Sequence, residues 1–170
     1  MASLMDELVG VLQEEIEAYE ELVTVSAQKT QYIVNADLEK MEASVDKEQE
    51  ITGHIKNLDN FRIAKTREMA DVINRNPDEM TLTHLISYLK NQPAEQRRLE
   101  QLRARLVDVV SRMKKVNDQN GLLIKQAMEM VEFDLTLFRS LRQAPETANY
   151  DKNAYNTGTL LGGSGFDAKQ

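Results

Sequence analysis

The most regular pattern in the chain is a row of apolar residues in its second half. Steps of three and four residues, taken alternately from Leu99, reach thirteen positions, of which only Asn120 and Asp134 are polar. These positions are Leu99, Leu102, Leu106, Val109, Met113, Val116, Asn120, Leu123, Ala127, Met130, Asp134, Leu137 and Leu141. Such a heptad row predicts one long helix that packs lengthwise against another helix. At a rise of about 1.5 Å per residue the row is about 60 Å long, so we expect an elongated molecule.

The first arm of the chain carries a less regular version of the same pattern. Its apolar positions are Met5, Leu8, Leu12, Tyr19, Leu22 and Ile33. Glu15, Ser26 and Lys29 interrupt this pattern, which restarts at Leu38 beyond the segment 35–37. We interpret the arm, which lacks proline, as one long helix with a bend. The pattern leaves open whether that helix is continuous or kinked near Asp37.

A short connection separates the two long arms. Residues 76–78, with the sequence Asn-Pro-Asp, predict a turn, and Asp78 or Thr81 can cap the helix that follows. Residues 81–90 fit a short helix whose apolar face consists of Leu82, Leu85, Ile86 and Leu89. Pro93 suits the first turn of the next helix, because its missing N–H needs no partner there. We therefore predict an all-α fold, an elongated antiparallel hairpin or bundle of two long helices with a short connecting helix.

The composition changes after Pro145. Four of the seven glycines fall at or after residue 158, with Asn, Thr and Ser between them. Little apolar surface is available there to offset an ordering cost of about 1–2 kcal/mol per residue, so we predict a flexible C-terminal tail. We divide the chain into a helical domain, residues 1–145, and this tail, residues 146–170. The tail nevertheless contains five large apolar residues, Tyr150, Tyr155, Leu160, Leu161 and Phe166.

The composition excludes several classes of protein. Cysteine is absent, so the chain has no disulfide framework and no thiolate nucleophile. No apolar run approaches the roughly 20 residues that span a bilayer, and the N-terminus does not have the pattern of a secretory signal. We therefore expect a cytoplasmic protein without membrane insertion. Residues 1–60 hold fourteen acidic residues against four basic ones, which argues against nucleic acid as the partner.

No group of residues in the sequence is suited to catalysis. The sequence has no glycine-rich phosphate loop, and its serines, histidines and acidic residues form no pairs beyond helical neighbours. The nearest approach to a metal site is Glu50 with His54, one helical turn apart. A di-metal site in a helical bundle requires two Glu-x-x-His motifs and two further carboxylates. We therefore expect no enzymatic activity, no cofactor and no bound metal.

A second apolar row, which we call the second stripe, accompanies the end of the heptad row. It consists of Ile124, Met128, Val131, Leu135 and Phe138. The two rows are offset by one residue, hence by about 100° around the helix. A two-helix hairpin covers only one of them, and burying each large aliphatic side chain contributes roughly 1.5–3 kcal/mol. We assign the second stripe to partner binding; cover by the short helix or by a second copy of the chain is the alternative.

A polar segment interrupts the long helix just before the second stripe. Asn120 occupies a heptad position, where a buried polar residue sets the register of packed helices at some cost in stability. Gly121 weakens a helix by about 1 kcal/mol relative to alanine, and it admits a bend or the close approach of another backbone. We assign structural roles to both residues and to Asn117 and Leu123. A turn here is the alternative, but the unbroken heptad spacing favours a continuous helix.

The sequence resembles the flagellar type III export chaperones of the FlgN family. The resemblance rests on Asn117-x-x-Asn120-Gly121-x-Leu123 within a long helix, followed by apolar positions to Leu141 and a tail that contains Tyr150. It covers nearly the whole chain. It implies a bacterial cytoplasmic chaperone that binds the helical terminal segments of unassembled hook-associated proteins, which form the hook–filament junction.

The resemblance also implies what such a chaperone does with its clients. It prevents their premature assembly and delivers them to the type III export gate. The tail tyrosine of the family, implicated in docking to the gate, corresponds to Tyr150. The nearest downstream glycine is Gly158, a longer spacing than the family pattern, so Tyr155 is an alternative. The alternative function is a coiled-coil adaptor that homodimerises through its C-terminal helix.

Overall fold

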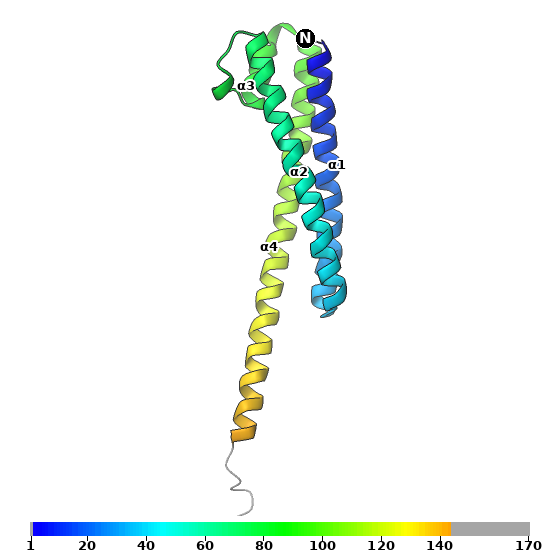
Figure 1. Ribbon diagram of the computed structural model, residues 1–170, viewed down its shortest axis with the longest axis vertical. Coiled ribbons are helices and arrows are strands. Elements are labelled where there is room, and N and C mark those ends of the chain that lie inside the picture. Colours follow the sequence, from blue (N-terminus) through cyan, green and yellow to red (C-terminus); the bar gives the residue numbers. More distant parts are fainter. Residues whose placement is uncertain (1, 144–170) are drawn as a thin grey trace, which may run out of the picture. The chain divides into compact units, whose positions relative to one another are not determined.

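The computed structural model describes residues 2–143, which are almost entirely helical (Figure 1). The elements are α1 (Ala2–Val34), α2 (Leu38–Val72), a 3₁₀ turn (Pro77–Glu79), α3 (Leu82–Tyr88), a second 3₁₀ turn (Leu89–Asn91) and α4 (Pro93–Gln143). The predicted all-α fold is confirmed. The predicted flexible tail, 146–170, lies outside the described residues.

The first arm forms two helices, and our prediction of one bent helix is wrong. The break lies at Ala36, whose φ of 54° ends α1 in the left-handed conformation. The Asp37 N–H donates to the Tyr32 carbonyl at 2.9 Å and the Ala36 N–H to the Ile33 carbonyl at 3.1 Å, a Schellman motif. The Asp37 carboxylate then caps α2 by accepting from the Lys40 N–H at 3.2 Å. The chain therefore reverses, and α1 and α2 lie antiparallel (Figure 1).

The left-handed conformation of Ala36 leads to a prediction about stability. This conformation costs an alanine roughly 1–2 kcal/mol and costs glycine almost nothing. We expect Ala36→Gly to raise the free energy of unfolding by about 0.5–1 kcal/mol, after allowance for the greater freedom of glycine in the unfolded chain. Urea denaturation followed by circular dichroism measures this change. Ala43→Gly, inside α2, is the matched control and should be destabilising; a similar loss at position 36 would contradict the prediction.

The connection between α2 and α4 agrees with the sequence prediction. Asn74, with φ of 52°, ends α2 by a second Schellman motif, and asparagine tolerates this conformation. The Asn76 side chain accepts from the Asp78 N–H in the predicted turn, and the Thr81 hydroxyl caps α3. The predicted apolar face of the short helix is buried at all four positions, Leu82, Leu85, Ile86 and Leu89. Pro93 is the first residue of α4, as expected.

Helix α4 runs parallel to α1 in a constant register. Arg98 pairs with Asp6 and Arg112 with Glu20, and each pair is separated by 92 residues. The side chain of Asn120 bonds to the Ser26 carbonyl, 94 residues away. Because α1 ends at Val34, this offset places its last residue level with residue 126 of α4. The compact unit that contains these contacts also ends at residue 126.

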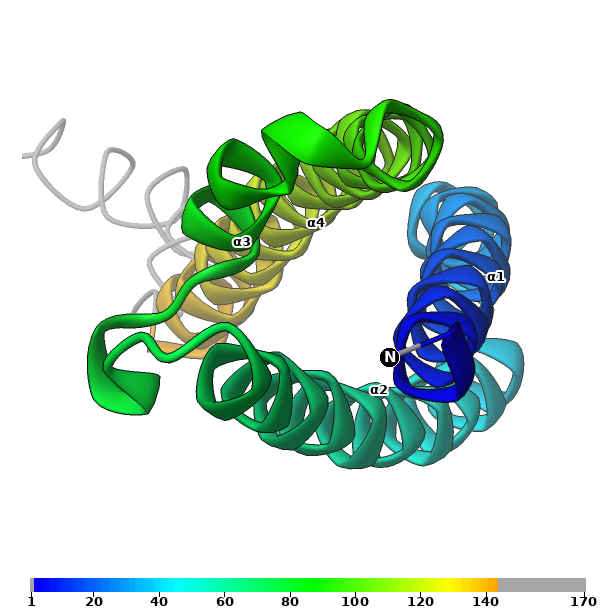
Figure 2. The ribbon, with the colours of Figure 1, turned by 90° about the horizontal axis from the view of Figure 1, so that it is seen from above.

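Two apolar clusters hold this unit together. The larger joins α1, α3, the end of α2 and the start of α4, and its fully buried members include Leu8, Leu85 and Leu99. The smaller joins α1 and α2 around Leu22 and Ile55, with Met113 of α4 packed against it. Figure 2, which looks down the helices, shows α1 beside both α2 and α4. The unit is therefore a bundle of three long helices, with α3 covering one end.

Candidate protein-binding surface of α4

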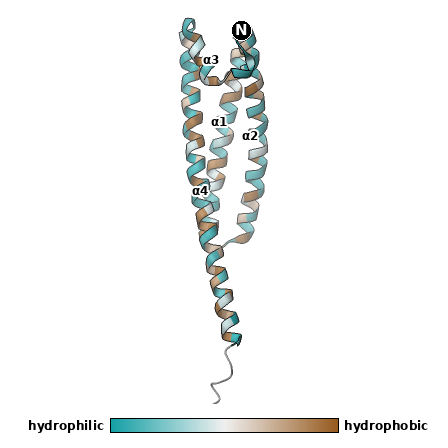
Figure 3. Ribbon diagram, turned by 90° about the vertical axis from the view of Figure 1, so that its left-hand side faces the viewer, coloured by the Kyte–Doolittle hydropathy of each residue, from teal (hydrophilic) through white to brown (hydrophobic). Residues whose placement is uncertain are grey.

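The end of α4 exposes large apolar side chains on more than one face. Met128 is 60% exposed and Phe138 66% exposed. The exposed set, which we call the α4 apolar surface, is Leu122, Met128, Met130, Val131, Phe133, Leu135, Leu137, Phe138 and Leu141. Figure 3 shows this stretch of α4 as mixed apolar and polar segments. It includes four residues of the second stripe; the fifth, Ile124, is partly buried.

The α4 apolar surface is wider than the sequence predicted. The heptad row is buried at Leu99, Leu102 and Val109, as expected for a helix packed in a bundle. Its later members Met130 and Leu137 are exposed, so the expectation that the first arm covers the whole row is wrong beyond residue 126. The physical reason is length, because α1 has no residue left at that level. Both apolar rows therefore face solvent in residues 127–143.

Such a surface is suited to binding another protein. Contiguous apolar patches on a soluble chain mark interaction sites, and burying each large side chain is worth roughly 1.5–3 kcal/mol. Residues 122–143 contain three acidic and three basic residues, so their net charge is zero and a bound partner would meet mainly apolar contacts there. Apolar side chains spaced three and four residues apart on a helix match the surface of a second helix. The arrangement supports helix-to-helix binding.

Asn120 links α4 to α1 at the end of the packed part of the heptad row. Its side-chain N–H donates to the Ser26 carbonyl at 2.8 Å, and its carbonyl oxygen accepts from the Thr30 hydroxyl at 2.6 Å. The side chains of Ser26 and Lys29 both bond to Glu48 of α2 at the same level. This polar layer therefore joins all three long helices. We propose that Asn120 sets the register of α4, because any axial shift leaves these buried groups without partners.

The other residues of the polar segment differ in their surroundings. Helix α4 is continuous through Asn120 and Gly121, as the heptad spacing predicted. A Cβ built on Gly121 meets no atom within 4 Å, so the described chain does not itself require glycine there. Asn117 is exposed and Leu123 partly buried. The structural roles that we assigned to Asn117 and Leu123 stay predictions.

The polar residues that interrupt the first arm are buried and paired, which the sequence pattern did not reveal. The Glu15 carboxylate accepts from Arg62 Nε of α2 at 2.9 Å, and Arg62 also pairs with Asp59. Burial raises the pKa of the Glu15 carboxyl, and the nearby Arg62 charge only partly offsets this effect. The ionised form of Glu15 is therefore disfavoured by folding, although it has a partner. An acid and a base 47 residues apart carry no local signal of such a pair.

The raised pKa of Glu15 predicts a pH dependence of stability. Between the ordinary pKa of a glutamate and the raised pKa of Glu15, the folded state binds more protons than the unfolded state. The contribution of Glu15 to the free energy of unfolding therefore decreases as the pH rises through this range. We expect Glu15→Gln to be more favourable, relative to the unchanged protein, at pH 7 than at pH 4. Urea denaturation at both pH values measures the difference.

Glu7→Gln is a control of opposite sign for the Glu15 experiment. Lys65 lowers the pKa of the exposed Glu7 carboxyl through a hydrogen bond and its charge. That stabilisation is present above the ordinary pKa and is lost as pH falls, so Glu7→Gln should be less favourable at pH 7 than at pH 4. The same sign for both variants would contradict the assignment of burial as the dominant effect at Glu15.

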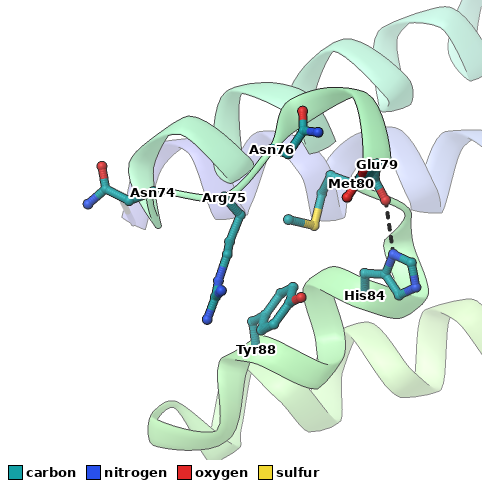
Figure 4. Close-up of a pocket in the computed structure, with 7 residues that line it drawn as sticks. All are labelled: Asn74, Arg75, Asn76, Glu79, Met80, His84 and Tyr88. Atoms are coloured by element: carbon teal, nitrogen blue, oxygen red, sulfur yellow. Dashed lines mark hydrogen bonds between the residues drawn. The ribbon is translucent and has the colours of Figure 1, made fainter.

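A small pocket lies in the connection between α2 and α4 (Figure 4). It has a volume of about 310 Å³ and is lined by Asn74, Arg75, Asn76, Glu79, Met80, His84 and Tyr88. The Arg75 guanidinium lies over the Tyr88 ring at 4.5 Å, and His84 Nδ1 is 2.9 Å from the Glu79 carbonyl oxygen. These contacts fix the connection against α3. They pair no nucleophile with a base, so the pocket supports a structural role.

Residues 2–143 offer neither a metal site nor a membrane-spanning helix. This part of the chain contains no group of three His, Cys, Asp or Glu residues placed to hold a metal ion. No helix within it combines the length and apolar content that crossing a membrane requires. Tyr150 and Tyr155, the predicted docking tyrosines, lie outside the described residues.

Comparison with models of known protein families gives a match over most of the chain. A family model described as FlgN protein matches residues 1–158, which include all four helices and the α4 apolar surface. No curated protein and no solved structure matches the chain.

Proposed function

The chain belongs to the FlgN family of flagellar export chaperones, and we propose that its clients are unassembled hook-associated proteins of the hook–filament junction. The observation that carries this proposal is the exposure of the α4 apolar surface. A helical terminal segment of a client, laid along α4, buries this surface and its own apolar face together. While it is bound, the client segment cannot pair with another subunit, so premature assembly is prevented.

We further propose that the chaperone delivers its client to the type III export gate in the bacterial cytoplasm. The family resemblance supports Tyr150 as the docking residue, with Tyr155 as the alternative. The last described residue of α4 is Gln143, and Tyr150 lies seven positions later in the sequence. This spacing separates the docking residue from the α4 apolar surface in sequence. The protein acts by binding alone and requires neither a cofactor nor catalysis.

Calorimetric titration with purified junction proteins of the source bacterium tests the choice of client. We expect full-length, unassembled junction proteins to bind, and the same proteins without their terminal helical segments to lose binding. Filament protein from the same bacterium is the control for nonspecific apolar contact. Absence of binding to every junction protein, or binding that does not need the terminal segments, would refute the proposal.

Separation of the two roles predicts a distinct effect for the tail. Tyr150→Ala should leave client affinity within about twofold, because the tyrosine lies outside the α4 apolar surface. The same change should lower secretion of the client into the medium, measured in a strain that carries the variant chaperone. Tyr155→Ala is the matched comparison and decides between the two tyrosines. A fall in client affinity in the Tyr150 variant would contradict the division between client-binding helix and docking tail.

A coiled-coil adaptor that homodimerises through α4 is the second candidate. The exposure of apolar residues on more than one face of α4 favours it, because a second copy could cover them equally well. Light scattering over a concentration series distinguishes the two functions. A dimer that persists at low concentration and excludes the junction proteins would support the adaptor.

A further inference from the structure

A groove runs between α2 and α4 within residues 1–126. It consists of two adjoining cavities of about 530 Å³ and 400 Å³ that share Tyr19, Val110 and Lys114. Helix α1 supplies the floor through Tyr19, and α2 and α4 supply the two walls. We call this feature the α2–α4 groove. It is distinct from the α4 apolar surface, all of whose members but Leu122 lie beyond residue 126.

The α2–α4 groove lies where a fourth helix would complete the bundle, and its lining includes exposed apolar side chains. Val107 is 56% exposed and Val110 39% exposed on the α4 wall, although both are aliphatic. Leu106 and Met113, also in the lining, are only partly buried. A bundle of three long helices buries these side chains fully when a fourth helix lies against them. The groove is therefore shaped for one helix with an apolar stripe.

The charges of the groove specify a further property of that helix. On the α2 wall, Glu48 pairs with Lys29, and Arg62 pairs with both Asp59 and Glu15 of α1. Lys114 on the α4 wall borders both cavities, and it takes part in none of the ion pairs found in residues 2–143. Lys114 is therefore a basic side chain of the groove lining without an ion-pair partner in the described part of the chain, and it lies beside an apolar strip. An acidic residue at the edge of the guest's apolar stripe complements it.

Gly121 is a second, independent observation in favour of a helix bound against α4. Val110, Lys114, Asn117, Gly121 and Ile124 follow one another at steps of four and three residues, so they share one face of α4. Glycine weakens a helix by about 1 kcal/mol relative to alanine, and nothing within 4 Å of a Cβ at Gly121 requires that loss. A client helix that passes close to the α4 backbone at this position would require glycine there.

We propose that the α2–α4 groove holds an amphipathic helix of the client, with an acidic residue against Lys114 and its closest approach to α4 at Gly121. The inference rests on the proposed function and adds to it a second binding region and a charge requirement. The second stripe continues this face of α4 at the same spacing through Met128 and Val131.

Charge reversal and glycine replacement test the inference in the full-length chain. The probe is the purified junction protein that binds the unchanged chaperone, titrated by calorimetry. We expect Lys114→Glu to weaken binding about tenfold, and Lys115→Glu, an exposed neighbour outside the groove lining, to change it less than about twofold. We expect Gly121→Ala to stabilise the free chaperone in urea denaturation and yet to weaken client binding. An acid-to-lysine change in the client helix should restore binding to the Lys114→Glu variant.

The outcomes separate this inference from the proposed function. If no junction protein binds the unchanged chain, the proposed function fails. If junction proteins bind and Val131→Asp abolishes binding, but Lys114→Glu and Gly121→Ala bind normally, the proposed function stands and the groove inference is wrong. The inference is also wrong if the groove is occupied without client, by a second copy at high concentration or by residues 146–170. Hydrogen exchange of the free chain, with and without residues 146–170, detects both cases.

Discussion

Val131→Asp combined with Leu135→Asp is expected to lower client affinity by more than about a hundredfold while the protein stays helical. Each change places a charge on an exposed apolar position of α4, where a bound client helix would have to desolvate it. Loss of two large apolar contacts, each worth roughly 1.5–3 kcal/mol, accounts for the size of the effect. Calorimetric titration measures the affinity, and circular dichroism measures the helicity.

The matched control for this variant is Gln126→Asp combined with Thr136→Asp. It changes the net charge by the same amount on the same helix, but neither position belongs to the heptad row or the second stripe. Client affinity should stay within about threefold of the unchanged protein, since only the general charge effect applies. If the Val131 and Leu135 variant lost helicity, those residues would be packed rather than exposed, and the assignment of the surface would be wrong.

Leu99→Ala is expected to lower the free energy of unfolding by about 2–5 kcal/mol. Leu99 is fully buried in the cluster that joins α1, α3 and α4, and its truncation leaves a cavity among well-packed neighbours. Leu137→Ala, at a later position of the same heptad row, is expected to change stability by less than about 0.5 kcal/mol. Urea denaturation of both variants, followed by circular dichroism, provides the comparison.

The contrast between these two leucines tests where the packed part of α4 ends. The sequence pattern treats Leu99 and Leu137 as equivalent, whereas Leu137 is 48% exposed in the structure. Equal destabilisation by both changes, in protein dilute enough to exclude self-association, would mean that α4 is covered along its whole length. The α4 apolar surface would then not be free for a client.

Periodicity predicted the helices well but could not predict where the first arm reverses. The apolar spacing identified α3, and residue types gave Thr81 as one of two candidate caps and Pro93 as the start of α4, because each has a local signal. The interruption at residues 35–37 indicated where a bend lies, but Ala36 gives no signal of a full reversal, because alanine is a strong helix former and rarely adopts the left-handed conformation. Three long helices therefore replaced the two that we predicted. The antiparallel pairing of α1 with α2 follows from this one residue.

Residue pattern also predicted the apolar rows of α4 without showing how much of them is covered. Whether Met130 or Leu137 is buried depends on the length of α1 and on its offset of 92 residues from α4. Neither the length nor the offset can be predicted from the sequence of α4. The same limit applies to Glu15 and Lys29, which the pattern marked only as interruptions. Their partners, Arg62 and Glu48, come from a helix that the prediction did not separate. Tertiary pairing determines these features.

Hydrogen exchange of the full-length chain, alone and with a purified junction protein, tests the central claim most directly. Few packed contacts protect an exposed helix end, so amides of residues 122–141 should exchange quickly in the dilute free protein. They should become strongly protected when the junction protein is bound, while amides near Leu8 and Leu99 stay slow in both states. Slow exchange of residues 122–141 in the dilute free protein, or no change there on binding, would contradict the account.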